Sequence, residues 1–283
     1  MVRPTGEYGV VIRFTHSTCL KRIHVTIVKR ILRSIDYRIF RNFGDLSYRK
    51  IIALRAHRIL ALDKYLNRNE IFSHKRDSVL NLLSDKYGSD KGTRGKITQI
   101  QRWPSHTYTD IYTFLFDHSK NSVKLVLECG IGSNDEKVTS NMTSSGVPGA
   151  SLRMWRDYFQ HAEIVGIDID VKALFDEDRI TTYQVDQTDS ASINSFIDRS
   201  KISEIDLVID DGLHEFHAAK SLFENIFPLT RSGGIYVIED VLLAQLAVYK
   251  RYFDGLGLDI SYILLHRHKL INDDNFLIII RKI

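Results

Sequence analysis

Five short apolar segments, separated by stretches long enough for helices, most constrain how this 283-residue chain can fold. The segments are VKLVLECG (123–130), EIVGIDI (163–169), TTYQVD (181–186), IDLVIDD (205–211) and GIYVIED (234–240). Strands that are apolar along most of their length belong to sheets covered on both faces. A regular alternation of strands and helices indicates a doubly wound parallel α/β sheet, whose ligands bind beyond the carboxyl ends of the strands.

Two further apolar segments close the sequence, ISYILLHRH (260–268) and NFLIIIRKI (275–283). The turn-rich LINDD lies between them and leaves no room for a helix, so they are predicted to form an antiparallel pair at one edge. The sequence thus predicts a seven-stranded Rossmann-like sheet in a domain spanning residues 82–283.

The first 80 residues differ in charge and in periodicity. They hold 17 lysines and arginines against 6 acidic residues, a net charge of +11, whereas the remaining 203 residues carry a net charge of −7. Residues 24–43 and 47–66 repeat apolar side chains every three or four positions, which predicts two amphipathic basic helices. Residues 1–81 are therefore predicted to form a basic helical extension. It either packs on the main domain or a second subunit, or contacts an anionic membrane surface or an acidic partner or carrier.

Several classes of protein are disfavoured by composition. No uncharged apolar run approaches the roughly 20 residues of a transmembrane helix. The first 16 residues lack the pattern of a secretory signal, which predicts a cytoplasmic protein. Cys19 and Cys129 form no metal or disulfide motif. No nucleic-acid motif accompanies the basic charge.

The glycine motif LVLECGIGS (125–133) follows the first predicted strand. Glycines allow backbone amides and a ligand to approach closely. A dinucleotide fingerprint needs a third glycine three residues after Gly132, but Asp135 occupies that position. Glu128 would repel a pyrophosphate and suits a cationic ligand, which favours S-adenosylmethionine over NAD.

Asp168 ends the second predicted strand and can accept hydrogen bonds from two ribose hydroxyls. A ribose-binding carboxylate serves NAD equally well. However, Asp168 lies 36 residues after Gly132, whereas the dinucleotide pattern expects about 20. The spacing again disfavours a nicotinamide cofactor.

Acidic residues also end the fourth and fifth predicted strands, in VIDDGLHEFH (208–217) and YVIEDV (236–241). Neighbouring strands would bring these like charges together, and a divalent cation is the simplest compensation. His214 follows at the same edge, where an imidazole can bind the metal or take a proton from an acidified hydroxyl.

Together these residues resemble the metal-dependent sugar O-methyltransferases of the class I S-adenosylmethionine superfamily. The matching stretches are YGSDKGT (87–93), HTY (106–108), LECGIGS, GVPGASLRMWRDYF (146–159), EIVGIDID, VDQTD (185–189), IDDGLHEFH and GGIYVIED. The resemblance covers about residues 82–283, and it implies S-adenosylmethionine and Mg²⁺ or Mn²⁺ as cofactors.

The resemblance also implies roles for individual residues. Asp211, Glu239 and Asp240 would bind the metal. His214 would be the general base, and Asp211 would be a second catalytic residue. Arg153 and the 134–150 loop border the acceptor. The implied cofactor-binding residues are Ser89, Lys91, Thr93, Glu128, Gly130, Asp168, Asp186, Gln187 and Asp210.

The sequence therefore predicts a metal-assisted methyltransferase acting on a sugar hydroxyl of a small molecule, a nucleotide sugar, or a surface-glycan or natural-product precursor. Two alternatives stay open. One is an N-methyltransferase or non-sugar O-methyltransferase of the same fold, and the other is a non-catalytic scaffold that binds acidic partners. The sequence leaves the acceptor, its regiochemistry and the oligomeric state undetermined.

Overall fold

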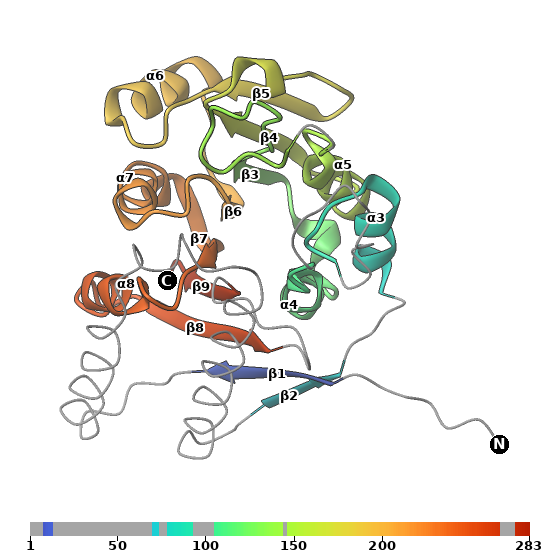
Figure 1. Ribbon diagram of the computed structural model, residues 1–283, viewed down its shortest axis with the longest axis vertical. Coiled ribbons are helices and arrows are strands. Elements are labelled where there is room, and N and C mark those ends of the chain that lie inside the picture. The colour runs from blue at the N-terminus through green and yellow to red at the C-terminus, as the bar shows by residue number, and fades with distance from the viewer. Residues whose placement is uncertain (1–7, 14–69, 74–77, 93–104, 144–145, 267–274) are drawn as a thin grey trace, which may run out of the picture.

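A computed structural model describes residues 8–13, 70–73, 78–92, 105–143, 146–266 and 275–283. Its centre is one sheet with the strand order β2-β1-β8-β9-β7-β6-β3-β4-β5 (Figure 1). The strands are β1 (Tyr8–Arg13), β2 (Glu70–Ser73), β3 (Leu125–Cys129), β4 (Glu163–Asp168), β5 (Ile180–Gln184), β6 (Ile205–Asp210), β7 (Thr230–Val241), β8 (Asp259–His266) and β9 (Phe276–Arg281). The described α-helices are α3 (Val79–Tyr87), α4 (Tyr108–Phe116), α5 (Ala150–Tyr158), α6 (Ser190–Ser200), α7 (Phe216–Ile226) and α8 (Leu246–Phe253).

All seven predicted strands are present. Strands β5, β4, β3, β6 and β7 are parallel neighbours, as the strand–helix alternation predicts. Strand β9 pairs antiparallel with both β7 and β8, which confirms the predicted terminal pair. The register sets Cys129 beside Asp210, and Asp210 beside Ile238. The ends of β3, β6 and β7 therefore meet at one edge of the sheet.

Two strands in the N-terminal region were not predicted. Strand β1 pairs antiparallel with β8, and β2 pairs antiparallel with β1, so together they extend the sheet beyond the methyltransferase-like part. The predicted helices over 24–43 and 47–66 lie outside the described residues. No helix in the described part of the chain is both long and apolar enough to cross a membrane.

Helices cover both faces of the sheet, α3 to α5 on one and α6 to α8 on the other (Figure 1). Each face has its own buried apolar cluster. Along β7, Ile235 and Val237 join the first cluster while Tyr236 and Ile238 join the second. Successive side chains of a strand point to opposite faces, so the nearly continuous apolar strands fill both cores.

The end of α3 directs the chain toward the strand ends. Ser78 caps the start of the helix by accepting a hydrogen bond from the Asn81 amide at 3.2 Å. Gly88 ends it in the left-handed conformation, with φ of 81°. Glycine adopts this conformation without steric cost, and the turn leads into Ser89 and Lys91 at the candidate site.

Candidate active site

The carboxyl ends of three parallel strands are fastened to one another by backbone hydrogen bonds. The Gly130 amide donates to the Ile167 carbonyl and the Asp211 amide donates to the Cys129 carbonyl, both at 2.9 Å. Gly130 has φ of +84°, and a Cβ atom there would lie 2.1 Å from the Asp211 carbonyl oxygen. Only glycine fits at this crossing of β3 and β6.

A cavity of about 490 Å³ lies at these strand ends. Nine of the predicted site residues line it: Ser89, Lys91, Gly130, Asp168, Asp186, Gln187, Asp211, His214 and Asp240. Residues from distant parts of the sequence thus share one wall.

Asp168 and Gln187 are held in place at one part of the cavity. The Asp168 carboxylate accepts hydrogen bonds from the amides of Ile131 and Asp170, both at 2.9 Å, and burial raises its pKa. Gln187 donates to Asp210 at 3.0 Å and accepts from the Leu213 amide at 2.7 Å. Gln187 therefore fixes the turn that leads to His214.

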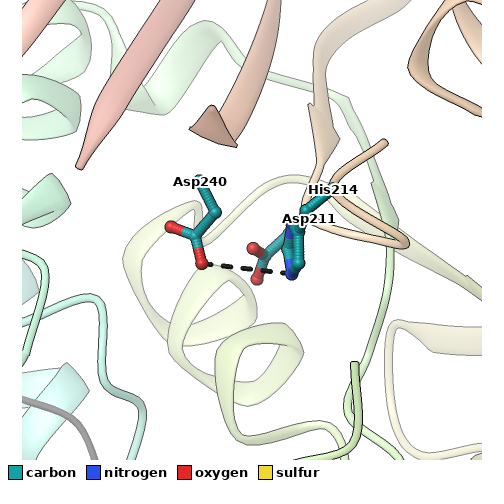
Figure 2. Close-up of side chains that lie close together, drawn as sticks. All are labelled: Asp211, His214 and Asp240. Carbon is teal, nitrogen blue, oxygen red and sulfur yellow. Dashed lines mark ion pairs between the residues drawn. The ribbon is translucent and has the colours of Figure 1, made fainter. Parts of the chain in front are cut away.

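Asp211, His214 and Asp240 converge at another part of the same cavity (Figure 2). One potential ligand atom from each lies within 4.8 Å of the others, and His214 Nε2 is 4.0 Å from Asp240 Oδ2. His214 Nδ1 is buried and makes no hydrogen bond within the described structure. Both His214 and Asp240 have positive φ, at 58° and 52°. Such conformations are uncommon outside glycine and cluster at functional sites.

Asp240 has a polar environment built by the start of α4 and the residues just before it. The Tyr108 hydroxyl donates to its carboxylate, and His106 Nδ1 lies 3.3 Å from Asp240 Oδ1. Burial by itself raises the pKa of Asp240, but His106, His214 and the Tyr108 hydroxyl together hold it below its ordinary value. Asp240 is therefore ionised near neutral pH.

Lys91 lies among three carboxylates. Its Nζ atom is 2.5 Å from Asp211 Oδ2 and 3.4 Å from Glu128 Oε1, and it also donates to Glu239. Desolvation lowers the pKa of Lys91, but Asp211 and Glu239 raise it well above its usual value. The ammonium thus stays charged although the residue is only 2% exposed.

Three predicted site residues lie behind the cavity wall. Glu128 accepts from Ser151 Oγ at 2.8 Å and from Trp155 Nε1 at 3.1 Å, and burial raises its pKa to about 7. Glu239 accepts from the Tyr112 hydroxyl at 2.6 Å, and Asp210 accepts from Gln187. Their roles in binding cofactor or metal stay predictions, and Thr93 lies outside the described residues.

The predicted loop after the glycine motif folds back over the cavity. Val138, Ser140, Asn141 and Met142 line the cavity. A Cβ atom on Gly132 would come within 2.6 Å of the Met142 side chain, so the glycine makes room for it. The loop ends where α5 begins at Ala150, as the sequence predicts.

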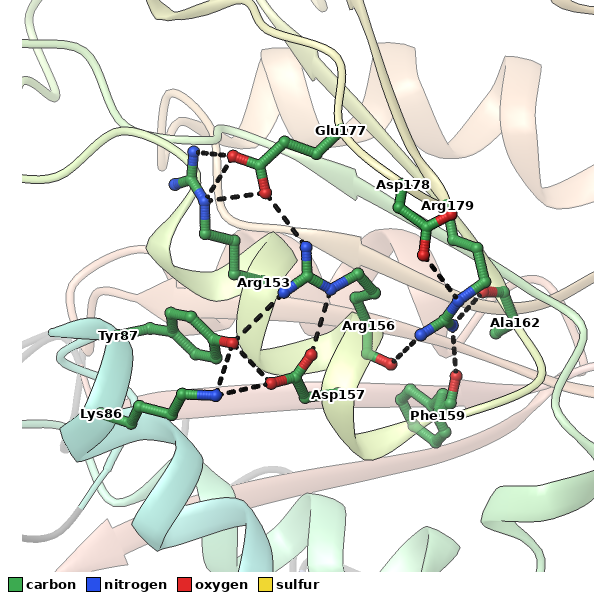
Figure 3. Close-up of polar contacts among 10 residues, drawn as sticks. All are labelled: Lys86, Tyr87, Arg153, Arg156, Asp157, Phe159, Ala162, Glu177, Asp178 and Arg179. Atoms are coloured by element: carbon green, nitrogen blue, oxygen red, sulfur yellow. Dashed lines mark hydrogen bonds and ion pairs between the residues drawn. The ribbon is translucent and has the colours of Figure 1, made fainter.

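Arg153 does not line the cavity, and its predicted position beside the acceptor stays a prediction. Its guanidinium pairs with Glu177 at 2.7 Å (Figure 3). It also donates to the Pro148 carbonyl at 2.9 Å. Arg156 also pairs with Glu177, and its Nε atom lies 3.0 Å from Asp157. This charged network fastens α5 to the segment before β5, because carboxylates and guanidiniums form paired hydrogen bonds readily.

Asp157 contributes pH-dependent stability through this network. Burial raises the pKa of Asp157, but hydrogen bonds from Tyr87, Lys86 and Arg156 lower it from 3.8 to about 2. A lowered folded-state pKa gives stability that is complete above about pH 4 and is lost as the pH falls toward 2. We expect Asp157→Asn to reduce the free energy of unfolding by about 1–2 kcal/mol at pH 7. The difference from the wild type should shrink below pH 4.

Urea unfolding at several pH values measures this difference. Asp178→Asn is the matched control, because the Asp178 side chain is 90% exposed and lies 3.9 Å from its arginine partner. Equal losses for the two variants, or a loss for Asp157→Asn that is constant with pH, would contradict the prediction.

Several residues that build the site have no role predicted from the sequence. His106 and Tyr108 come from the HTY motif, and Tyr112 follows one helical turn later. All three contact carboxylates near the end of β7, far away in the sequence. The motif itself was the available signal, but nothing in its spacing indicates these contacts.

Comparisons with known proteins point to one group of enzymes. The chain is 33% identical over 172 residues to the 8-demethyl-8-alpha-L-rhamnosyl tetracenomycin-C 2'-O-methyltransferase of Streptomyces olivaceus, covering 61% of this chain and 40% of that relative. It is 36% identical over 159 residues to the demethylmacrocin O-methyltransferase of Streptomyces fradiae, covering 56% and 36%. The chain therefore spans less than half the length of these curated relatives. No protein-family model matches the chain.

A solved structure shares the fold. It is the MycE methyltransferase of the mycinamycin biosynthetic pathway in complex with Mg, SAH and mycinamycin VI, with a TM-score of 0.52 and 26% identity. The match covers 73% of this chain and 55% of MycE. The chain therefore has the fold of the class I S-adenosylmethionine methyltransferases, and its sequence is similar to those of sugar O-methyltransferases of natural-product pathways.

Proposed function

We propose that the chain is an S-adenosylmethionine-dependent methyltransferase that methylates a sugar hydroxyl of a glycoside, as part of a natural-product or surface-glycan precursor. One observation carries the proposal. Asp211, His214 and Asp240 converge in the same cavity that Gly130 and Asp168 line. A cation-binding and proton-accepting group therefore adjoins the strand ends at which this fold binds its cofactor.

The residues fit a divalent cation. Asp211 and Asp240 offer two carboxylates from neighbouring strands, and hard cations such as Mg²⁺ and Mn²⁺ prefer oxygen ligands. MycE, which shares the fold, was solved with Mg. We assign Asp211 and Asp240 as ligands, with Glu239 behind them. When bound, the cation supplies positive charge that acidifies a neighbouring acceptor hydroxyl.

The chain's own residues perform the remaining tasks. Asp168 lies where it can accept hydrogen bonds from ribose hydroxyls, next to the glycine turn. His214 accepts the proton that the acceptor hydroxyl loses as its oxygen bonds to the methyl carbon and the carbon–sulfur bond breaks. Asp240, 4.0 Å from His214 Nε2, stabilises the resulting imidazolium. Val138, Ser140, Asn141 and Met142 line the cavity and would limit the access of water to that side of it.

Calorimetric titration with S-adenosylhomocysteine tests the cofactor assignment. We expect micromolar binding of S-adenosylhomocysteine, and none of NAD, in the presence of Mg²⁺. Transfer of a labelled methyl group to a glycoside with vicinal hydroxyls, rather than to an amine or a phenol, tests the acceptor class. Absence of S-adenosylhomocysteine binding both with Mg²⁺ and after chelation would overturn the proposal. Cytoplasmic location and any contact of the basic extension with membranes or acidic partners stay predictions of the sequence.

A further inference from the structure

The most unusual charge in the site is the ammonium group of Lys91. The residue is 2% exposed, and its Nζ atom contacts carboxylates from the ends of three different strands, those of Glu128, Asp211 and Glu239. Glu128 and Glu239 are almost fully buried, at 0% and 1% exposure. A buried carboxylate that loses its partner cation is strongly destabilising.

Hydrogen bonds fix the backbone around Lys91, and this backbone positions the ammonium group. The Lys91 amide donates to Ser89 Oγ at 3.3 Å, and the Lys91 carbonyl accepts from the Thr109 amide at 3.0 Å. The flanking segment is joined to the start of α4 by the hydrogen bond from the Thr107 amide to the Gly92 carbonyl, at 3.1 Å. Lys91 therefore enters the acidic cluster from a segment that is hydrogen-bonded on both sides of it.

The position of Lys91 divides the acidic residues into two groups. Glu128 and Glu239 contact the ammonium from behind the cavity wall, whereas Asp240 lines the cavity beside His214. Asp211 belongs to both groups, because its Oδ2 atom is 2.5 Å from Lys91 Nζ while the residue also lies in the potential metal-binding cluster. The ammonium and a divalent cation thus share Asp211 and would repel each other.

We propose that Lys91 is the internal counter-ion of the acidic cluster, which keeps the site folded without a divalent cation and competes with that cation for Asp211. Lys91 is thus a positioning residue with two effects: it stabilises the metal-free site, and it weakens metal binding. The inference rests on the proposed metal site. The ammonium of Lys91 makes metal binding weaker than the carboxylates alone would make it.

Replacing Lys91 by methionine, which retains much of the side-chain volume, tests both halves of the inference. Without divalent cations, we expect Lys91→Met to lower the melting temperature by roughly 5–15 °C, because buried carboxylates lose their cation. Adding Mn²⁺ should raise the melting temperature more in Lys91→Met than in the wild type. The dissociation constant for Mn²⁺, measured by calorimetry, should fall by about tenfold or more.

Two further variants make the test specific. Lys86→Met removes a lysine whose side chain is 57% exposed and pairs with Asp157, and it should leave Mn²⁺ affinity unchanged. The double variant Lys91→Met with Glu239→Gln removes one orphaned charge, while the introduced amide can still accept the hydrogen bond from the Tyr112 hydroxyl. It should recover at least half of the lost melting temperature, and it provides a folded protein if the single variant does not fold.

The outcomes separate this inference from the proposed function. A Lys91→Met melting temperature equal to that of the wild type without cations would overturn the inference. The inference would also be overturned if Lys91→Met bound no Mn²⁺, or bound it no more tightly than the wild type does. A different result would be that the wild type binds no S-adenosylhomocysteine, either with Mg²⁺ or without any cation. That result would count against the proposed function and not against the role of Lys91.

Discussion

Replacement of His214 by alanine is expected to lower kcat for methyl transfer by roughly 10²–10⁴-fold, the usual contribution of a positioned general base. The residue lies in the cavity wall, and its Nε2 atom is 4.0 Å from Asp240. No described hydrogen bond ties His214 Nδ1 to the fold. The affinity for S-adenosylhomocysteine should therefore change little, while turnover is lost.

The backbone at His214 calls for a second variant. Alanine is strained at a φ of +58°, whereas asparagine is several-fold enriched among residues in the left-handed region. His214→Asn should lose turnover as severely as His214→Ala and keep the wild-type melting temperature. His217→Ala is the matched control, since His217 lies three positions away with a side chain that is 65% exposed. More than a third of the wild-type kcat in both His214 variants would refute the role as base.

Asp240→Asn is expected to weaken Mn²⁺ binding by at least about tenfold, with a comparable or larger loss of turnover at limiting metal. The substitution removes one of the two carboxylate charges in the potential metal-binding cluster, and charge is what attracts a hard cation. Asparagine keeps the shape, tolerates the φ of 52°, and can still accept the Tyr108 hydrogen bond. The expected loss is therefore electrostatic and not a consequence of misfolding.

Calorimetry with Mn²⁺ measures this loss, and S-adenosylhomocysteine binding reports whether the cavity is intact. Asp254→Asn is a suitable control, because Asp254 accepts from the Tyr262 hydroxyl at 3.0 Å and does not line the cavity. If Asp240→Asn and Asp254→Asn bind Mn²⁺ as tightly as the wild type, Asp240 is not a ligand.

Most of the fold could be predicted from local patterns. A run such as 205–211 places apolar side chains in the buried clusters on both faces, so the sheet must be covered on both sides by helices. The turn-rich LINDD is too short for a crossover, so β8 and β9 must be antiparallel. Strands β1 and β2 were missed because they are six and four residues long and lie in a segment dominated by a helical pattern. Their pairing depends on the free edge of β8, which no local pattern describes.

The candidate site was only partly predictable. Asp168, Asp211 and Asp240 each lie at or just after the end of a strand, and parallel strands end at the same edge, so their convergence follows from the strand order. The position of Arg153 on α5 does not reveal that its guanidinium pairs with Glu177, which lies in the segment before β5. His106 contacts Asp240 although the two lie far apart in the sequence.

The sequence by itself therefore determined the parallel sheet, the glycine turn at Gly130 and the acidic edge, because each depends on residues that are adjacent along one strand or on neighbouring strands. Only the tertiary structure decided that Lys91 neutralises Glu128 and Glu239, and that Asp211 and Asp240 remain with His214 at the cavity. Charges repel or pair according to distance and burial. Both are set when residues 88–92 and 105–108 pack against the strand ends, a contact that no local pattern in the sequence encodes.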